Sequence, residues 1–363
     1  MSVLGDEIRA MIASGGPITV ERYMELALSH PDHGYYMNRD PFGAAGDFTT
    51  APEISQMYGE LLGLWAAEVW SLMGRPNPVR LIEFGPGRGT LMSDALRAAR
   101  IVPEFRSALD VTLVEVSPTL ANIQYEALVT CGAPVSWAAG LAEAPEGPAI
   151  IFANEFLDAL PVRQYVRRGG RWRERTVRLD EGRQLAFGLA HDPEPHLRVD
   201  AEEGAVLEVN AVGHRFMFEL SARLARQGGA ALFVDYGHGA TGFGDTLQAL
   251  RAHRYVDPLV DPGQVDITAH VDFAAMARSA RASGAAVYGP IDQSDFLRTL
   301  GIDMRTKALA ERAPERADEF ETARRRLVGK GEGEMGSLFK AMVVANRILS
   351  PPPGFQPYSS RQT

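Results

Sequence analysis

The sequence contains very little cysteine and lysine, and both shortages exclude classes of chemistry. Cys131 is the single cysteine among 363 residues, so the chain can form no internal disulfide and no zinc site built from several thiolates. Its lysines are Lys307, Lys330 and Lys340, so arginine supplies almost all of the positive charge. The formal net charge of −9 argues against general binding of nucleic acid through a basic surface.

The sequence also lacks any apolar run as long as a membrane span. Its first residues, MSVLGDEIRAMIASGG, contain acids early and no extended apolar stretch, so they do not resemble a secretory signal. We therefore predict a cytoplasmic protein without a membrane span. With 45% hydrophobic and 23% charged residues, the composition is typical of a globular protein with ample material for a core.

From residue 79 onward, short apolar segments alternate with amphipathic ones. Strands are predicted at VRLIEFG, DVTLVEVS, VSWAAG and AIIFANEF, with helices at GTLMSDALRAAR and PTLANIQYEALV. Strands that are apolar along their whole length are typical of a parallel sheet covered by helices on both faces. The alternation therefore predicts an α/β fold with a doubly wound, Rossmann-like sheet.

Other segments interrupt this pattern and suggest how the chain is divided. Residues 162–204 begin with two strand-like runs that meet at Gly169-Gly170, which predicts an inserted β-rich subdomain with a hairpin. The predicted divisions are a helical cap with a long loop (1–78), the α/β core (79–161 and 205–347, with added helices at about 270–328), the insert (162–204) and a disordered tail (348–363).

A glycine-rich turn follows the first predicted core strand, in the sequence EFGPGRGTL. Gly85, Gly87 and Gly89 occupy every second position after Glu83. Glycine lets the backbone approach a ligand closely or adopt a positive φ angle. The dinucleotide pattern G-x-G-x-x-G would need a glycine where Thr90 stands, and the Gly-Lys-Ser/Thr ending of a Walker loop is absent. The turn therefore fits NAD poorly and ATP phosphates not at all.

The acids near this turn fit S-adenosylmethionine better, because that molecule carries a sulfonium, an amino-acid end and a ribose but no phosphate. Glu83 can face the amino group of the methionine part. Glu115, at the end of the next predicted strand, stands where a ribose-binding acid is expected. We predict an S-adenosylmethionine site, with NAD and an incidental strand–turn–helix junction as the alternatives.

Polar residues also follow the apolar strand in IIFANEFLDALPV. Asn154, Glu155 and Asp158 are expected at the carboxyl edge of the sheet, where open α/β sheets bind their ligands. Asn154 is a predicted cofactor contact. Two carboxylates beside a sulfonium could orient a cationic acceptor and accept its proton, so Glu155 and Asp158 are the predicted catalytic residues. The alternative is a helix N-terminus whose dipole favours acids.

A second strand end, in FVDYGHG, provides predicted substrate contacts at Asp235, Tyr236 and His238, with a plain strand exit as the alternative. The acids and the histidine of VDPLVDPGQVDITAHVDF suggest a metal site as another alternative. The prolines and apolar residues between them favour a structured loop instead, and methyl transfer needs no metal, so no metal is predicted.

Several motifs, taken in order from about residue 5 to 347, resemble the MidA family of S-adenosylmethionine-dependent methyltransferases. They are HPDHGYY, GDFTTAPEISQMYGE, EFGPGRGTL, ANEFLDALPV, VDYGH, DITAHVDF and GEMGSLFKAM. The resemblance implies a class I methyltransferase fold. Because mitochondrial members of the family are protein arginine methyltransferases that assist assembly of respiratory complex I, it also implies an arginine nitrogen as the methyl acceptor.

The resemblance further implies that the segment GDFTTAPEIS covers the cofactor. Gly46, Asp47, Thr49 and Thr50 are therefore predicted cofactor contacts, while Glu53 either joins them or caps the helix that follows.

We thus predict an S-adenosylmethionine-dependent enzyme that methylates an arginine nitrogen of a protein, with a complex I subunit as the candidate substrate and a second copy of the chain as a candidate partner. Methyl transfer to a small molecule and a cofactor-binding assembly chaperone without turnover are the alternatives.

Overall fold

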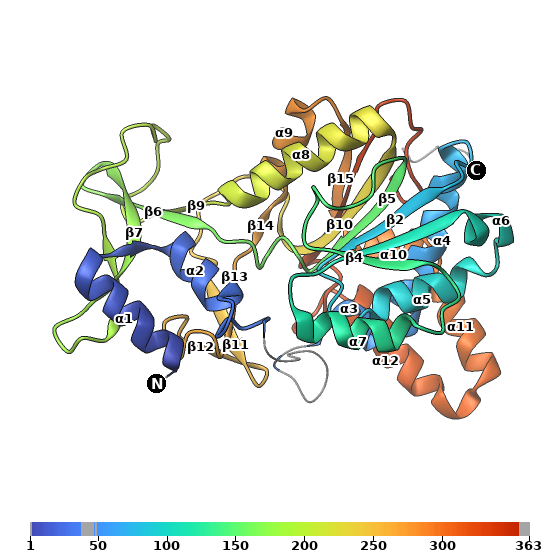
Figure 1. Cartoon of the computed structure of the whole chain (residues 1–363), viewed down its shortest axis with the longest axis horizontal. Helices are drawn as coiled ribbons and strands as arrows, with labels where there is room; N and C mark the ends of the chain where they lie inside the picture. The colour runs from blue at the N-terminus through green and yellow to red at the C-terminus, as the bar shows by residue number, and fades with distance from the viewer. Residues whose placement is uncertain (1, 38–46, 48, 356–363) are drawn as a thin grey trace.

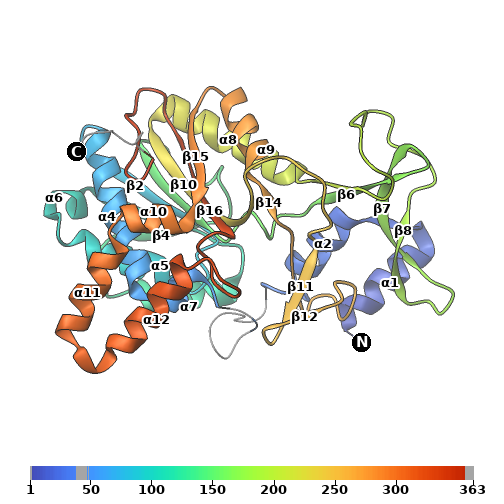
Figure 2. The same cartoon turned by 180° about the vertical axis from the view of Figure 1, so that it is seen from behind.

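The computed structural model describes residues 2–37, 47 and 49–355. These residues form a core lobe around a large sheet and a small lobe beside it, seen from two sides in Figures 1 and 2. The core lobe holds the glycine-rich turn, and the small lobe holds the N-terminal helices together with the inserted hairpin.

The core lobe is built on a sheet that has eight strands within the described residues, in the order β15-β16-β10-β5-β2-β3-β4, with β14 paired to the end of β10. The strands from β10 to β4 run parallel, whereas β16 pairs antiparallel with β10 and β15 pairs antiparallel with β16. The strands are β2 (Val79–Phe84), β3 (Leu109–Val114), β4 (Val135–Ala138), β5 (Ala149–Asn154), β10 (Gly229–His238), β14 (Val271–Asp272), β15 (Ala286–Asp292) and β16 (Phe339–Ala345).

Helices cover both faces of this sheet, which confirms the doubly wound α/β prediction. One face is covered by α8 (Ala211–Gln227) and α9 (Phe273–Ala282), and the other chiefly by α4 (Gln56–Leu72) and α5 (Thr90–Ala99). The remaining helices of this lobe are α3 (Ala51–Ile54), α6 (Pro103–Ala108), α7 (Pro118–Leu128), α10 (Gln293–Thr299), α11 (Ile302–Arg312), the 3₁₀ turn η1 (Pro314–Arg316) and α12 (Ala317–Val328). No helix in the described part of the chain is long and apolar enough to cross a bilayer.

The small lobe joins three stretches that are far apart in the sequence. Its helices pack against two small sheets, β1-β7-β6-β9 with β8 on β7, and β12-β11-β13, which we call the β11 sheet. The elements are α1 (Val3–Gly15), β1 (Ile18–Thr19), α2 (Val20–Ser29), β6 (Arg163–Arg168), β7 (Arg171–Leu179), β8 (Leu185–Leu189), β9 (Val206–Val209), β11 (Gln248–Arg251), β12 (Arg254–Val256) and β13 (Asp266–Thr268).

The N-terminal helices and the insert, which the sequence suggests as separate divisions, share one apolar core. Ile8 of α1 and Tyr23 of α2 pack in the same cluster as Val177 of the insert and Ile267 of the β11 sheet. A helix pair this short cannot bury its apolar faces alone, so it uses the hairpin and the β11 sheet as its partners.

The predicted disordered tail is wrong for residues 348–355. The indole Nε1 of Trp65 donates a hydrogen bond to the carbonyl oxygen of Pro353 at 3.1 Å, and the Phe355 ring lies 5.4 Å from that of Phe296. The composition is rich in proline, but these apolar residues find partners on α4 and α10. Residues 356–363 lie outside the described part of the chain.

Candidate active site

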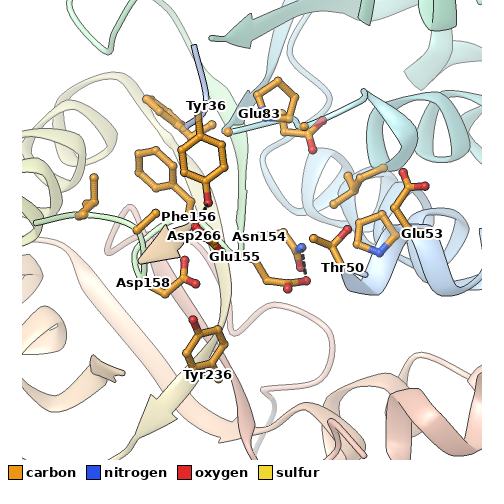
Figure 3. Close-up of a pocket in the computed structure, with 18 of the residues that line it drawn as sticks. Tyr36, Thr50, Glu53, Glu83, Asn154, Glu155, Phe156, Asp158, Tyr236 and Asp266 are labelled. Atoms are coloured by element: carbon orange, nitrogen blue, oxygen red, sulfur yellow. Dashed lines mark hydrogen bonds between the residues drawn. The ribbon is translucent and has the colours of Figure 1, made fainter. Parts of the chain in front are cut away.

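A cavity of about 710 Å³ lies where the two lobes meet, at the carboxyl ends of β2, β3, β5 and β10. This is the edge at which open α/β sheets bind their ligands, and the volume is within the usual range for ligand clefts. Figure 3 shows side chains that line it, contributed by both lobes.

The glycine-rich turn after β2 presents backbone and one buried carboxylate to this cavity. Glu83 is only 2% exposed, and burial raises the pKa of its carboxyl to about 8. Its Oε2 has no hydrogen-bond partner among the described residues. Gly85 and Gly87 line the cavity with φ angles of +61° and +54°. A cationic amino group placed here would pair with Glu83, as the amino group of a methionine moiety would.

Gly89 and Thr90 have roles other than those of a dinucleotide turn. Gly89 lies outside the cavity lining and begins α5 at φ +79°, so it serves the backbone conformation of the turn rather than a cofactor contact. The Thr90 hydroxyl donates a hydrogen bond to Oε1 of Glu53, and both residues line the cavity.

Glu115 at the end of β3 lines the cavity and is held in a fixed orientation. Its Oε1 accepts the backbone N–H groups of Val116 and Ser117, each at 2.8 Å. Gln124 of α7 donates to its Oε2 at 2.9 Å and to the carbonyl oxygen of Gly87 at 2.8 Å. Burial is the main cause that raises the pKa of Glu115. Gln124 thus ties the predicted ribose-binding acid to the glycine turn, a role that sequence periodicity gave no reason to assign.

Asn154, the last residue of β5, and Glu155, which follows it, line the cavity and are linked to each other. The Tyr58 hydroxyl donates to Oδ1 of Asn154 at 2.5 Å, and Nδ2 of Asn154 donates to Oε1 of Glu155 at 3.2 Å. The same Oε1 accepts the backbone N–H of Ala51 at 2.9 Å. Burial raises the pKa of Glu155 to about 8, so these donors orient a carboxyl that holds a proton at neutral pH while the cavity is empty.

Asp158 lies deeper at the same strand end and is 6% exposed. Burial raises the pKa of its carboxyl to about 6, although a hydrogen bond from the Tyr236 hydroxyl opposes that shift. Its Oδ1 is buried without a partner among the described residues. Tyr236 also lines the cavity, and its role as a substrate contact stays a prediction.

Asp235 and His238 do not line the cavity, so their prediction as substrate contacts is corrected. Successive side chains of β10 point to opposite faces, so Asp235 points away from the side on which Tyr236 reaches the cavity. The Asp235 carboxylate is 1% exposed, and its oxygens accept backbone N–H groups from Phe156, Leu157, Asp158 and Tyr236. His238 instead places Nδ1 at 2.6 Å from the carbonyl oxygen of Ala240.

The predicted covering segment is only partly in contact with the cavity. Thr49 and Thr50 line it, whereas Asp47 does not. Asp47 accepts hydrogen bonds from the Tyr35 hydroxyl and from the backbone N–H of Ala252, each at 2.8 Å, and so joins two parts of the small lobe. Gly46 lies outside the described residues.

The acids that suggested a metal alternative are dispersed by the fold. Asp266 lines the cavity, Asp272 caps α9 through the N–H of Ala275, and Asp261 pairs with Arg251. The described residues contain no group of three or more His, Cys, Asp or Glu side chains that could hold a metal ion.

Comparison with known proteins agrees with this arrangement. A family model described as "Putative S-adenosyl-L-methionine-dependent methyltransferase" matches residues 61–291. The mouse (Mus musculus) protein named "Protein arginine methyltransferase NDUFAF7, mitochondrial" is 38% identical over 340 residues, covering 84% of this chain and 75% of that protein. The Drosophila melanogaster homologue is 35% identical and covers 96% of this chain and 86% of that protein. The chain belongs to this methyltransferase family.

A solved structure extends the likeness to three dimensions. A crystal structure from Burkholderia thailandensis, bound to S-adenosyl-homocysteine, superposes with a TM-score of 0.85 at 31% identity, covering 97% of this chain and 93% of that one. The resemblance to the MidA family, the enzyme class and S-adenosylmethionine as the cofactor are thereby confirmed. The predicted cytoplasmic location is overturned, because the curated relatives are named mitochondrial.

Proposed function

We propose that this methyltransferase methylates an arginine nitrogen of a protein. The relatives named protein arginine methyltransferases support this acceptor. So does the observation that carries most weight, the buried Oδ1 of Asp158, which has no hydrogen-bond partner among the described residues and lies near Glu155 at the carboxyl edge of the sheet. Two carboxyls that are shielded from water are costly unless a cation joins them, and a guanidinium is such a cation.

The residues of the cavity divide into a cofactor part and an acceptor part. Glu83 would hold the amino group of S-adenosylmethionine, Glu115 its ribose hydroxyls, and the Gly85 and Gly87 backbone would pass close to its methionine end. When bound, the cofactor supplies a methyl group made electrophilic by the sulfonium. Thr49 and Thr50 would close this part from the side of α3.

Glu155 and Asp158 would act on the acceptor nitrogen. A guanidinium is a weak nucleophile while its lone pair is delocalised, so carboxylates that hold the positive charge on one nitrogen make the other more reactive. The pKa of about 8 for Glu155 lies near neutral pH, which suits a group that loses its proton when the cation arrives and accepts the proton released after transfer.

Incubation of the purified chain with labelled S-adenosylmethionine and an extract from cells that lack it tests the proposal. We expect label on a protein, and mass spectrometry should find it on arginine; a subunit of respiratory complex I is the candidate suggested by the MidA resemblance. Label only on small molecules would favour the first alternative. Cofactor binding without labelling of any component would favour the assembly chaperone. Association of two copies remains a separate prediction, which analytical ultracentrifugation tests.

A further inference from the structure

The β11 sheet presents one row of side chains to the cavity from the small lobe. Leu250 in the middle strand is the register partner of Tyr255 on β12 and of Asp266 on β13. Directly opposed residues of antiparallel strands point to the same face, and all three residues line the cavity. Their chain neighbours Ala249 and Ile267 point the other way, into the core of the small lobe.

Exposure and chemistry change steadily along this row. Tyr255 is 73% exposed, Leu250 is half-buried and Asp266 is 4% exposed. Neighbouring strands lie about 4.8 Å apart, so the row spans roughly 10 Å from solvent to its buried end. The row thus offers an aromatic ring at the mouth, an aliphatic side chain half-way and a carboxylate at the bottom.

The buried end of the row lies on the same side of the cavity as Asp158 of the core lobe (Figure 3). The Tyr36 hydroxyl donates a hydrogen bond to Oδ1 of Asp266 at 2.7 Å and so fixes the orientation of that carboxylate. Burial, and then the charges of Asp266 and Asp158, raise the pKa of Tyr36. Asp266 of the small lobe and Asp158 of the core lobe both line the cavity, and Figure 3 shows them on the same side of it.

We propose that this row is the channel that admits the arginine side chain of the substrate. The guanidinium lies between Asp266 and Asp158, its methylene stem follows Leu250, and the adjoining peptide contacts the Tyr255 ring. Arginine suits such a channel because it combines an apolar stem with a planar fork of five N–H donors that can serve carboxylates on two sides. A lysine ammonium is a compact point charge with three donors and lacks the planar fork that matches a carboxylate with two parallel hydrogen bonds. The inference rests on the proposed function and adds that the channel selects a guanidinium on an apolar stem over an ammonium.

Binding of small cations to the full chain loaded with S-adenosyl-homocysteine tests the channel without requiring turnover. The probes are n-butylguanidinium and n-butylammonium chloride, titrated by calorimetry or NMR. We expect the unaltered protein to prefer butylguanidinium by on the order of tenfold, which is the effect of one added charge-assisted hydrogen bond. Asp266→Asn should remove that preference. Leu250→Trp, which fills the middle of the channel, should weaken both probes.

Arg254→Ala is the matched control, because Arg254 is exposed on the same strand as Tyr255 but points to the opposite face. It should bind both probes like the unaltered protein, and unchanged affinity for S-adenosyl-homocysteine shows that each variant is folded. Equal affinity of the unaltered protein for the two probes would overturn the channel, as would full binding by both Asp266→Asn and Leu250→Trp. Failure of the proposed function is a different result, namely guanidinium binding with no labelled arginine in the extract experiment.

Discussion

The carboxylate of Asp235 holds the backbone of Asp158 in place across two neighbouring strands. Its Oδ2 accepts the N–H of Asp158 at 3.2 Å, together with the N–H groups of Phe156 and Leu157 at 3.1 and 2.9 Å. Three donors converge on one oxygen, which fixes the turn that carries both proposed acceptor acids. Asp235 is thus a positioning residue behind the site.

Replacing this acid should therefore affect stability as well as transfer. In Asp235→Asn, an amide NH₂ faces backbone donors on one side and leaves at least one of them unsatisfied. We expect the free energy of unfolding to fall by about 1–3 kcal/mol, the cost of an unpaired buried polar group. Urea denaturation measures it, with His238→Ala at the end of the same strand as a control that should change little. A variant as stable as the unaltered protein would contradict this role.

Cofactor binding should release protons near neutral pH. Burial raises the pKa of Glu83 from its ordinary value of 4.5 to about 8, so the empty site holds a proton there at pH 7. A cationic amino group beside Glu83 favours the carboxylate form of its side chain. This proton therefore leaves on cofactor binding at pH values between 4.5 and about 8. Calorimetry in buffers of different ionisation enthalpy counts the protons released.

Glu83→Gln provides the control for that measurement. It cannot release the proton, and we expect its affinity for S-adenosyl-homocysteine to fall about 10- to 100-fold, because a charge-assisted hydrogen bond is lost. Equal proton release by the variant and the unaltered chain would show that another group titrates.

Two glycines of the same turn should respond differently to substitution. At Gly85, with φ +61°, an added Cβ would lie 3.0 Å from Cδ2 of Phe156, so Gly85→Val is strained and intrudes on the cavity. At Gly89 the nearest contact is an ordinary 3.5 Å to Gln124, and asparagine tolerates left-handed backbone. We expect Gly85→Val to abolish binding of S-adenosyl-homocysteine and Gly89→Asn to retain it. The reverse order would refute the roles assigned to the two positions.

The pH profile of methyl transfer should follow Glu155. Below its pKa of about 8 this carboxyl is protonated in the free enzyme, so a guanidinium must first displace that proton before Glu155 can accept one from the acceptor nitrogen. Accordingly, kcat/KM should rise with pH and level off above about pH 8. In Glu155→Gln we expect transfer to fall by at least about 100-fold and this rise to disappear, with cofactor affinity unchanged. Substantial transfer by the variant would rule out Glu155 as the proton acceptor.

Local sequence pattern was sufficient for the fold and for the residues nearest the sheet edge. Glu83 is the penultimate residue of its strand, and Glu115 and Glu155 each follow theirs directly. The carboxyl ends of parallel strands must meet at one edge of the sheet. The same reasoning failed for Asp235, because a strand end alone does not say which of two adjacent side chains faces the ligand. Which of Asp235 and Tyr236 faces the cavity depends on how β10 is placed between β5 and β16 in the sheet.

The sequence by itself determined the α/β core, the cofactor turn and the family, because these depend on apolar periodicity and on residues close together in the chain. Only the tertiary structure decided that Tyr36 and Asp266 bond to each other and line the same cavity as Asp158, since the small lobe packs against the core lobe. It also decided the place of residues 348–355. Their proline-rich composition predicts disorder, but in the fold they pack against Trp65 and Phe296. Long-range contacts of this kind arise from shape and burial, which no local pattern encodes.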